Sequence, residues 1–296
     1  TSVSLETKLY WCIRQAEPPK PNDKEIREAL AFFKQTSKLL KRKRLVVDVC
    51  GSHGLIGGLF VAFGKAHAAV VLDKFKPNSF AQICEAWAPY VGGEVGTGRL
   101  HFLRQDFKRA LPGLLSCDST SPISYAEMGL ENLTASEIGV VACHACSHMS
   151  DEIITMCIAA QVDFAVMPCC HRDTVTQGQM ALVAQTLGTS EHAVIDAARV
   201  GSVAARGYDC RWRTIDASIS PENRIIIGLA KYKAGALAAR QASKEASDSK
   251  IGHIYAKIHQ LKSDPFQHVD SENGGPPSEG VSQCEPCEPA GGPKGA

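Results

Sequence analysis

The sequence predicts an α/β fold: a Rossmann-like, seven-stranded, mostly parallel sheet with an antiparallel edge hairpin and helices on both faces. Five short apolar runs, each typical of a buried strand, alternate with stretches of helical periodicity over residues 45–206. Alternating strands and helices favour parallel crossovers, which cover both faces of a sheet. Two further strand-like runs, at 208–216 and 222–232, are joined by the turn-like sequence ASISP and therefore predict the hairpin.

The composition is that of an ordinary globular protein of 296 residues, with 44% hydrophobic and 21% charged residues. The net charge of +1 gives no overall attraction to nucleic acid or to an anionic membrane, although a local patch stays compatible with either. No apolar run approaches the roughly 20 residues that span a bilayer, so we expect no membrane span. The twelve cysteines are scattered through apolar segments, and we expect mostly reduced thiols, as in the cytoplasm or an organelle matrix.

The predicted elements follow in order along the chain. Residues 1–44 form an N-terminal extension, expected to be helical from about Asp23, with a basic end at Lys41, Arg42, Lys43 and Arg44. The sheet domain covers 45–233, with parallel strands at 45–49, 68–74, 99–107, 138–146 and 163–170. Helices are expected at 55–66, 77–90, 149–161, 175–187 and 190–206, and a long polar stretch at 112–136. A C-terminal helix at 234–262 and a disordered tail at 263–296, rich in Pro, Gly, Ser and Glu, are expected to follow.

Residues suited to a small-molecule site follow the parallel strands. In an open α/β sheet, ligands bind outside the carboxyl ends of the strands. The residues found there are mainly carboxylates, glycines, histidines and cysteines: Asp48, Cys50, Gly51, Gly54, Asp73, Asp106, Phe107, His144, Cys146, His148, Cys169, Cys170 and His171. The sequence therefore predicts a ligand site along this edge of the sheet.

The first two strand ends indicate a nucleoside cofactor. Gly51 and Gly54 have no side chain to keep a ligand away from the backbone. Asp73, at the end of the next strand, can accept hydrogen bonds from both hydroxyls of a ribose. A dinucleotide would require the pattern G-x-G-x-x-G, whose first two glycines are missing in this register. S-adenosylmethionine has no phosphates and requires less of the loop, so the sequence favours it over NAD.

Four segments together resemble class I S-adenosylmethionine-dependent methyltransferases: DVCGSHG at 48–54, VVLDK at 70–74, HACSHMSD at 144–151 and PCCH at 168–171. Within that class they resemble the branch with the patterns D-x-C-G-G-x-G, H-A-C-G-x-x-T-D and P-C-C-H, which includes the methyltransferase-domain-32 proteins. A eukaryotic tRNA ribose 2′-O-methyltransferase family has a similar cysteine–histidine segment. The similarity covers roughly residues 38–232, and the order of the motifs at successive strand ends makes it specific.

The resemblance implies a methyltransferase sheet and a role for each matching residue. Asp48, Cys50, Gly51 and Gly54 would form the cofactor loop, Asp73 would hold the ribose, and Asp106 with Phe107 would flank the adenine. Cys146 would belong to the cofactor site through the H-A-C pattern, and Cys169 and Cys170 would line the substrate pocket. Ser52, Ser147 and Ser150 depart from the pattern, and the Asn-Pro-Pro-Tyr motif of amino-group methylases is absent after the fourth strand.

A histidine is the expected catalytic base, because methyl transfer to a hydroxyl requires removal of a proton near neutral pH. His171 is the first candidate and His144 the second, and the alternative for His171 is a hydrogen-bonded structural residue. Cys169 and Cys170 have no activating partner in the sequence, so they suit a pocket wall better than a nucleophile.

Zinc is the alternative use of these residues, because cysteine and histidine are its preferred ligands. The candidate ligands are Cys143, His144, Cys146, His148, Cys169, Cys170 and His171. Cys143 and His144 should point to opposite faces of a strand, so the set is not expected to converge. Cys284 and Cys287 lack a second pair, and we therefore expect no metal site.

The basic run at 41–44 could contact RNA phosphates, or it could complement the dipole at the end of a helix. The favoured function is an S-adenosylmethionine-dependent methyltransferase that acts on RNA, as in tRNA processing. Two alternatives stay open. One is a non-catalytic subunit with a methyltransferase fold inside a larger assembly, such as an organellar one. The other is a methyltransferase for a small molecule or a protein.

Overall fold

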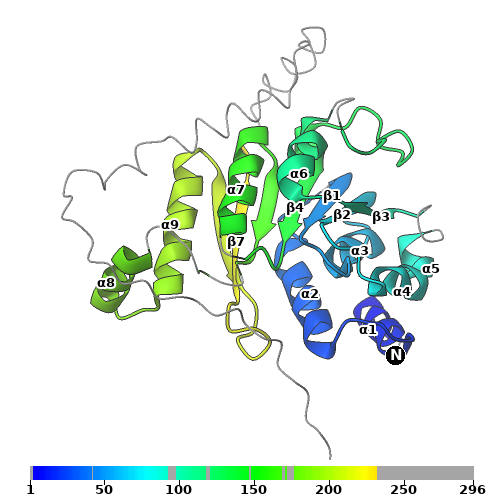
Figure 1. The fold of residues 1–296 in the computed structure, drawn as a ribbon, viewed down its shortest axis with the longest axis horizontal. Helices are drawn as coiled ribbons and strands as arrows, with labels where there is room; N and C mark the ends of the chain where they lie inside the picture. The colour runs from blue at the N-terminus through cyan, green and yellow to red at the C-terminus, as the bar shows by residue number, and fades with distance from the viewer. Residues whose placement is uncertain are drawn as a thin grey trace, which may run out of the picture. The chain divides into compact units, whose positions relative to one another are not determined.

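A seven-stranded sheet in the order β3-β2-β1-β4-β5-β7-β6 is the centre of the fold (Figure 1). The structure is a computed structural model that describes residues 3–41, 43–92, 98–117, 121–146, 148–168, 171 and 177–231. The strands are β1 (Leu45–Val49), β2 (Ala68–Asp73), β3 (Leu100–Arg104), β4 (Ile138–Ala142), β5 (Asp163–Val166), β6 (Asp209–Thr214) and β7 (Arg224–Leu229). Strands β1 to β5 run parallel, and β7 lies antiparallel between β5 and β6. The predicted sheet and its edge hairpin are confirmed.

Alternate residues of the strands face two separate cores. Leu45, Val47 and Val49 of β1 pack with α6 (Phe107–Ser116), α7 (His148–Ala160) and α9 (Glu191–Ala205). Val46 packs on the other face with α1 (Leu5–Gln15), α2 (Asp23–Thr36), α3 (Leu55–Ala62), α4 (Ser79–Ala86) and α5 (Ala88–Val91). Helices therefore cover both faces of the sheet, as predicted, while α8 (Gln177–Leu187) packs against α9 (Figure 1).

Two helix boundaries differ from the prediction. The helix predicted from Asp23 ends at Thr36 and not in the basic run, because Leu40 enters the core and Arg44 leads directly into β1. Helix α1 precedes it as a separate element. The stretch predicted to be polar from residue 112 begins inside α6, because Leu114 and Leu115 are buried in the core.

The N-terminal helices pack directly on the sheet domain. The indole Nε1 of Trp87 donates a hydrogen bond to the carbonyl oxygen of Leu9 over 3.0 Å, which ties α1 to the turn after α4. Helix α2 begins with a capping box, in which Asn22 and Glu25 each accept a hydrogen bond from the other's backbone N–H. Helix α2 then lies against α3, so its first turns reach the end of β1.

Across the described ranges, none of the helices combines the length and the apolarity that crossing a bilayer takes. The predicted C-terminal helix at 234–262 and the predicted tail at 263–296 lie outside the described residues.

Candidate cofactor and acceptor site

The loop after β1 has an unusual backbone. Cys50, Ser52 and Gly54 have φ values of 55°, 43° and 76°, so every second residue of the loop is left-handed. This region suits glycine, and Cys50 and Ser52 occupy it despite their side chains. Burial raises the pKa of the Cys50 thiol to about 12, so the thiol is neutral and unsuited to nucleophilic attack. The loop therefore offers backbone groups to a ligand.

Asp48 lies beneath this loop, and its carboxylate is buried. Its Oδ2 accepts a hydrogen bond from the backbone N–H of Gly57 over 2.9 Å, whereas its buried Oδ1 has no partner among the described residues. Burial, assisted by the charge of Asp73, raises the pKa of Asp48 to about 7. A Cβ on Gly51 would lie 2.6 Å from Cγ of Asp48, so only glycine fits above it. The structure places Asp48 and Gly51 together, and their role in cofactor binding stays a prediction.

Asp73, at the end of β2, faces the loop. Its Oδ2 accepts a hydrogen bond from the backbone N–H of Ser52 over 3.1 Å, and its Oδ1 accepts one from Phe75 over 3.2 Å. Each carboxylate oxygen retains capacity for a further donor, such as a ribose hydroxyl. The neighbouring Phe75 is 74% exposed, which is unusual for a large apolar residue.

Asp106, at the end of β3, is the N-cap of α6. Its side chain accepts a hydrogen bond from the backbone N–H of Lys108 over 2.9 Å and pairs with Lys74 over 3.1 Å. The Lys108 hydrogen bond and the Lys74 charge hold the pKa of Asp106 below its ordinary value. Phe107 is buried in the core. Asp106 therefore lies at the predicted edge, and its place beside an adenine stays a prediction.

Two consecutive side chains at the end of β4 point in opposite directions, as predicted. Cys143 is buried, and His144 turns outward with its side chain 49% exposed. Nε2 of His144 lies 3.1 Å from Oε2 of Glu28, a carboxylate of α2 whose side chain is only 3% exposed. Cys146 is disulfide-bonded, whereas the other described cysteines form no disulfide.

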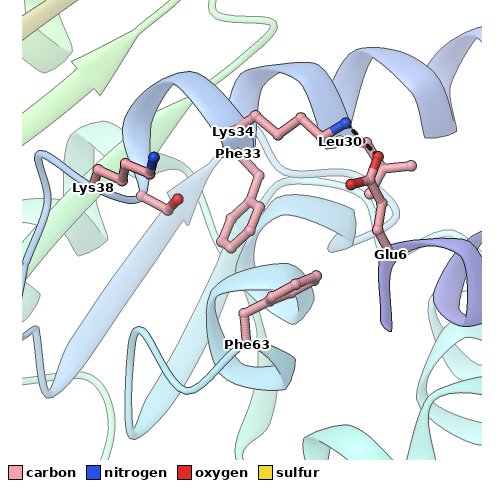
Figure 2. Close-up of a pocket in the computed structure, with 7 residues that line it drawn as sticks. Glu6, Leu30, Phe33, Lys34, Lys38 and Phe63 are labelled. Atoms are coloured by element: carbon pink, nitrogen blue, oxygen red, sulfur yellow. Dashed lines mark ion pairs between the residues drawn. The ribbon is translucent and has the colours of Figure 1, made fainter. Parts of the chain in front are cut away.

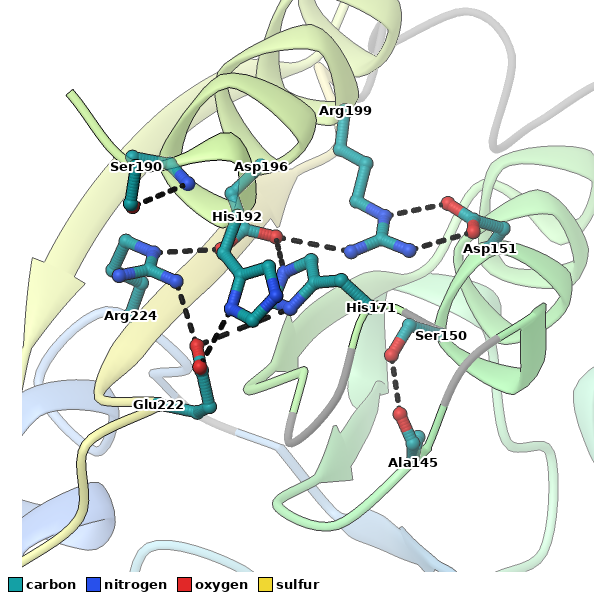
Figure 3. Close-up of polar contacts among 11 residues, drawn as sticks. Ala145, Ser150, Asp151, His171, Ser190, His192, Asp196, Arg199, Glu222 and Arg224 are labelled. Carbon is teal, nitrogen blue, oxygen red and sulfur yellow. Dashed lines mark hydrogen bonds and ion pairs between the residues drawn. The ribbon is translucent and has the colours of Figure 1, made fainter. Parts of the chain in front are cut away.

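The end of β5 carries a buried network of charged residues (Figure 3). His171 is buried, and its Nε2 donates a hydrogen bond to Oδ1 of Asp196 over 2.8 Å. Asp196 also accepts hydrogen bonds from Arg199 over 3.0 Å and from Arg224 over 2.8 Å. The ring of His192 stacks on His171 with centroids 4.3 Å apart. Cys169 and Cys170 lie outside the described residues.

His171, His192 and Glu222 are close enough to be considered as metal ligands, with candidate atoms within 4.8 Å of one another. The two imidazole planes are stacked at 14°, so their in-plane lone pairs run side by side and do not converge on one point. Glu222 also accepts a hydrogen bond from Arg224 over 2.7 Å, and that guanidinium would repel a cation. This geometry suits a network of hydrogen bonds better than a tetrahedral zinc site.

The basic run lies at the opposite edge of the sheet, before β1. Lys43 is buried, and its Nζ lies 2.6 Å from Oδ2 of Asp163, so it cannot present its charge to RNA as predicted. Arg44 donates hydrogen bonds to the backbone carbonyls of Glu131 and Gly129, each over 3.1 Å. Lys41 is exposed, and Arg42 lies outside the described residues. The end of the run therefore serves the fold, because it anchors the start of β1.

A hollow of about 230 Å³ lies beside the end of α2 (Figure 2). It is lined by Glu6, Leu30, Phe33, Lys34, Ser37, Lys38 and Phe63. Phe63 follows the C-terminal end of α3, whereas the cofactor loop precedes the other end of that helix. None of the predicted site residues lines this hollow.

Sequence reasoning missed Glu28, His192, Asp196 and Glu222. No spacing in the sequence connects Glu28 with His144, or Asp196 with His171, because each pair meets only through the packing of a helix on the sheet. The stretch 190–206 was predicted to be helical, but nothing in it indicated that Asp196 faces inward.

Comparisons with known proteins found distant structural similarities. No family model matches the chain, and no curated protein does. Three solved structures illustrate the likeness. An O-methyltransferase family protein from Burkholderia thailandensis has 12% identity and a TM-score of 0.37, with 70% of this chain and 59% of that one covered. An rRNA methylase from Streptococcus thermophilus has 8% identity and a TM-score of 0.36, with 72% and 99% covered. TrmK of M. capricolum, in complex with S-adenosylhomocysteine, has 11% identity and a TM-score of 0.38, with 78% and 94% covered.

These similarities are too distant to add to the strand order. That order and the antiparallel β7 define the fold of class I S-adenosylmethionine-dependent methyltransferases, and the protein has this fold. The chain spans 59% of the Burkholderia thailandensis protein.

Proposed function

We propose that the protein is an S-adenosylmethionine-dependent methyltransferase with RNA as its acceptor. The observation that carries the proposal is the unpartnered Oδ1 of the buried Asp48, beneath a loop of alternating left-handed residues. A buried carboxylate oxygen without a donor costs free energy, and a bound ligand with an N–H or ammonium group would supply that donor. Asp73 faces the same loop with acceptor capacity to spare.

Different residues of the chain would bind the cofactor and remove the acceptor proton. Gly51 and Gly54 would let the cofactor approach the backbone, and Asp73 would orient its ribose. S-adenosylmethionine, when bound, supplies an electrophilic methyl group on a sulfonium. His144 would remove the acceptor proton, because it is half-exposed at the neighbouring strand end. His171, the first candidate in the sequence, is buried against Asp196 and stacked under His192, which supports a positioning role.

RNA as the acceptor is supported by the motifs alone, through their resemblance to a tRNA ribose methyltransferase family. A hydroxyl acceptor is consistent with a histidine base. The acceptor would enter at the carboxyl ends of β4 and β5, beside the cofactor loop. Small-molecule or protein acceptors, and a non-catalytic role in an assembly, are the alternatives that the experiments below distinguish.

Calorimetric titration with S-adenosylhomocysteine tests cofactor binding. Wild type is expected to bind, and Asp73→Asn to weaken binding by about tenfold or more, since hydrogen bonds to a charged group contribute about 1.5–3 kcal/mol. Asp209→Asn is the control, because Asp209 pairs with Arg211 on the distant edge strand β6. If wild type does not bind even at millimolar ligand, the methyltransferase proposal fails and a non-catalytic subunit is favoured.

Incubation with a methyl-labelled donor and total cellular RNA or total protein identifies the acceptor class. Label that ribonuclease releases supports RNA, whereas label that only protease releases overturns the RNA part of the proposal. His144→Ala is expected to lower the labelling rate by about a hundredfold or more while S-adenosylhomocysteine binding persists.

A further inference from the structure

We infer that Glu28 of α2 is the positioning carboxylate of His144, so that the N-terminal extension forms part of the active site. The inference rests on the proposed methyltransferase function and adds a residue that no sequence motif indicates. It follows from the contact between Oε2 of Glu28 and Nε2 of His144, which lie 3.1 Å apart.

The two side chains differ sharply in exposure. The side chain of Glu28 is 3% exposed, whereas that of His144 is 49% exposed. The carboxylate is therefore held by the packing of α2, and the imidazole is open to an incoming molecule. This is the arrangement in which a buried acid orients a base by accepting the hydrogen bond from its far nitrogen.

The surroundings of Glu28 favour its ionised form. Burial acts to raise the pKa of Glu28, but the hydrogen bond and charge of His144, with a smaller contribution from Ser220, hold it below its ordinary value. An ionised carboxylate accepts a hydrogen bond from Nε2–H, which leaves Nδ1 as the basic nitrogen. Among the described residues, no hydrogen bond to Nδ1 of His144 is present.

Helix α2 also contacts the cofactor half of the site. One turn before Glu28, Oε1 of Glu25 lies 3.6 Å from Nε2 of His53, a residue of the loop after β1. The charge of His144 offsets a small part of the rise in the pKa of Asp48, so the imidazole acts electrostatically on the loop's buried carboxylate. Helix α2 thus spans the ends of β1 and β4, between which a methyl group would pass.

The transfer step balances without any further reactant. The acceptor oxygen forms a bond to the methyl carbon as the carbon–sulfur bond breaks, and the electron pair of that bond stays on sulfur. The acceptor O–H proton moves to Nδ1 of His144. Glu28 stabilises the resulting imidazolium by keeping the hydrogen bond from Nε2–H.

His171 does not fill this role in the same way. Its Nε2 is bonded to Asp196, its Nδ1 lies 3.9 Å from Glu222, and its ring is covered by His192. It is also buried, so an acceptor hydroxyl would have to displace neighbouring side chains to reach it.

The pairing can be tested without an acceptor by ¹⁵N NMR of histidine-labelled protein. Wild type is expected to hold His144 in the Nε2–H tautomer, and Glu28→Ala to lose that preference. Glu6→Ala is the matched control, because Glu6 is a carboxylate of the same extension that pairs with Lys34 over 2.5 Å beside the hollow. An unchanged His144 signal in Glu28→Ala would overturn the inference.

The catalytic consequence is tested by the pH–rate profile. Glu28→Gln keeps the shape of the side chain and removes its charge, so it should lower the rate by about tenfold or more and shift the acid limb of the profile. Glu28→Asp should recover part of the rate, and all variants should bind S-adenosylhomocysteine as wild type does. A Glu28→Gln variant with the wild-type rate and pH–rate profile would refute the role of Glu28 and leave the proposed function intact. Loss of ligand binding in wild type would instead refute the proposed function.

Discussion

Two carboxylates of the site, Asp48 and Asp196, are equally buried, with 1% exposure each, and have opposite surroundings. Asp196 accepts hydrogen bonds from three cationic or titratable side chains: His171 over 2.8 Å, Arg199 over 3.0 Å and Arg224 over 2.8 Å. Asp48 accepts one, from the backbone N–H of Gly57, and its second oxygen has no partner among the described residues.

The two pKa values move in opposite directions as a result. Burial raises the pKa of Asp48 to about 7. Burial also acts on Asp196, but hydrogen bonds from His171 and Arg224 and the charge of Arg199 hold its pKa below the ordinary value. The charge of Asp196 is thus compensated within the chain, whereas Asp48 retains an oxygen that a ligand could compensate. The network around Asp196 is therefore satisfied by the chain itself, and the β1 end suits binding.

The largest expected effect comes from removing Asp196, the buried carboxylate whose charge is compensated by its neighbours. Asp196→Ala should lower the free energy of unfolding by about 3–5 kcal/mol, because it leaves buried cationic groups without their shared carboxylate. Urea denaturation at neutral pH measures this change.

Asp209→Ala is the matched control for that loss. Asp209 pairs with Arg211 over 2.7 Å, and the two side chains are 42% and 48% exposed, so about 0–1 kcal/mol is expected. Equal losses in the two variants would show that burial of Asp196 adds nothing and would remove the contrast.

The fold was predictable because it depends on local patterns. The strand cores at 45–49 and 68–73 are continuous apolar runs, each followed by a turn, and a parallel sheet buries such runs on both faces. The helix boundary at Thr36 was not predictable, because it depends on how Leu40 enters the core.

Within the candidate site, only the residues that directly follow the strands could be predicted. Asp48, Asp73 and His144 lie at the predicted edge, since parallel strands end on the same side. The difference between His144 and His171 was not predictable, because it is made by Glu28 and Asp196, which come from helices packed on opposite faces of the sheet. Lys43 was misjudged for the same reason, since Asp163 becomes its partner only in the folded sheet.

A smaller effect, of opposite sign, is expected at the uncompensated end. Between the ordinary pKa of 3.8 and about 7, the folded protein binds a proton at Asp48 that the unfolded chain does not. The contribution of Asp48 to the free energy of unfolding therefore falls as pH rises through this range. Asp48→Asn should remove this dependence and stabilise the protein at pH 8 by about 1–3 kcal/mol, because it removes a charge that is buried without full compensation.

The same variant separates stability from function. S-adenosylhomocysteine should raise the Tm of wild type and raise that of Asp48→Asn much less. Asp196 shows the opposite pH dependence, because its pKa is lowered in the folded protein. Its contribution to the free energy of unfolding is present above the ordinary aspartate pKa and is lost as the pH falls through the lowered pKa. A less stable Asp48→Asn at pH 8, or one with an undiminished Tm response, would contradict the assignment of Asp48 to a ligand.

The smallest expected effect concerns two exposed apolar side chains, one beside the cofactor loop and one on α8, away from it. Phe75 is 74% exposed beside Asp73, and Leu187 is 67% exposed on α8. Stacking of a base on an aromatic ring contributes about 1–3 kcal/mol. Phe75→Ala should therefore weaken S-adenosylhomocysteine binding by about fivefold or more without a change in Tm of the free protein. Leu187→Ala should change neither quantity. Equal affinities in the two variants would show that Phe75 does not touch the ligand and would confine the binding end to Asp48, Asp73 and their loop.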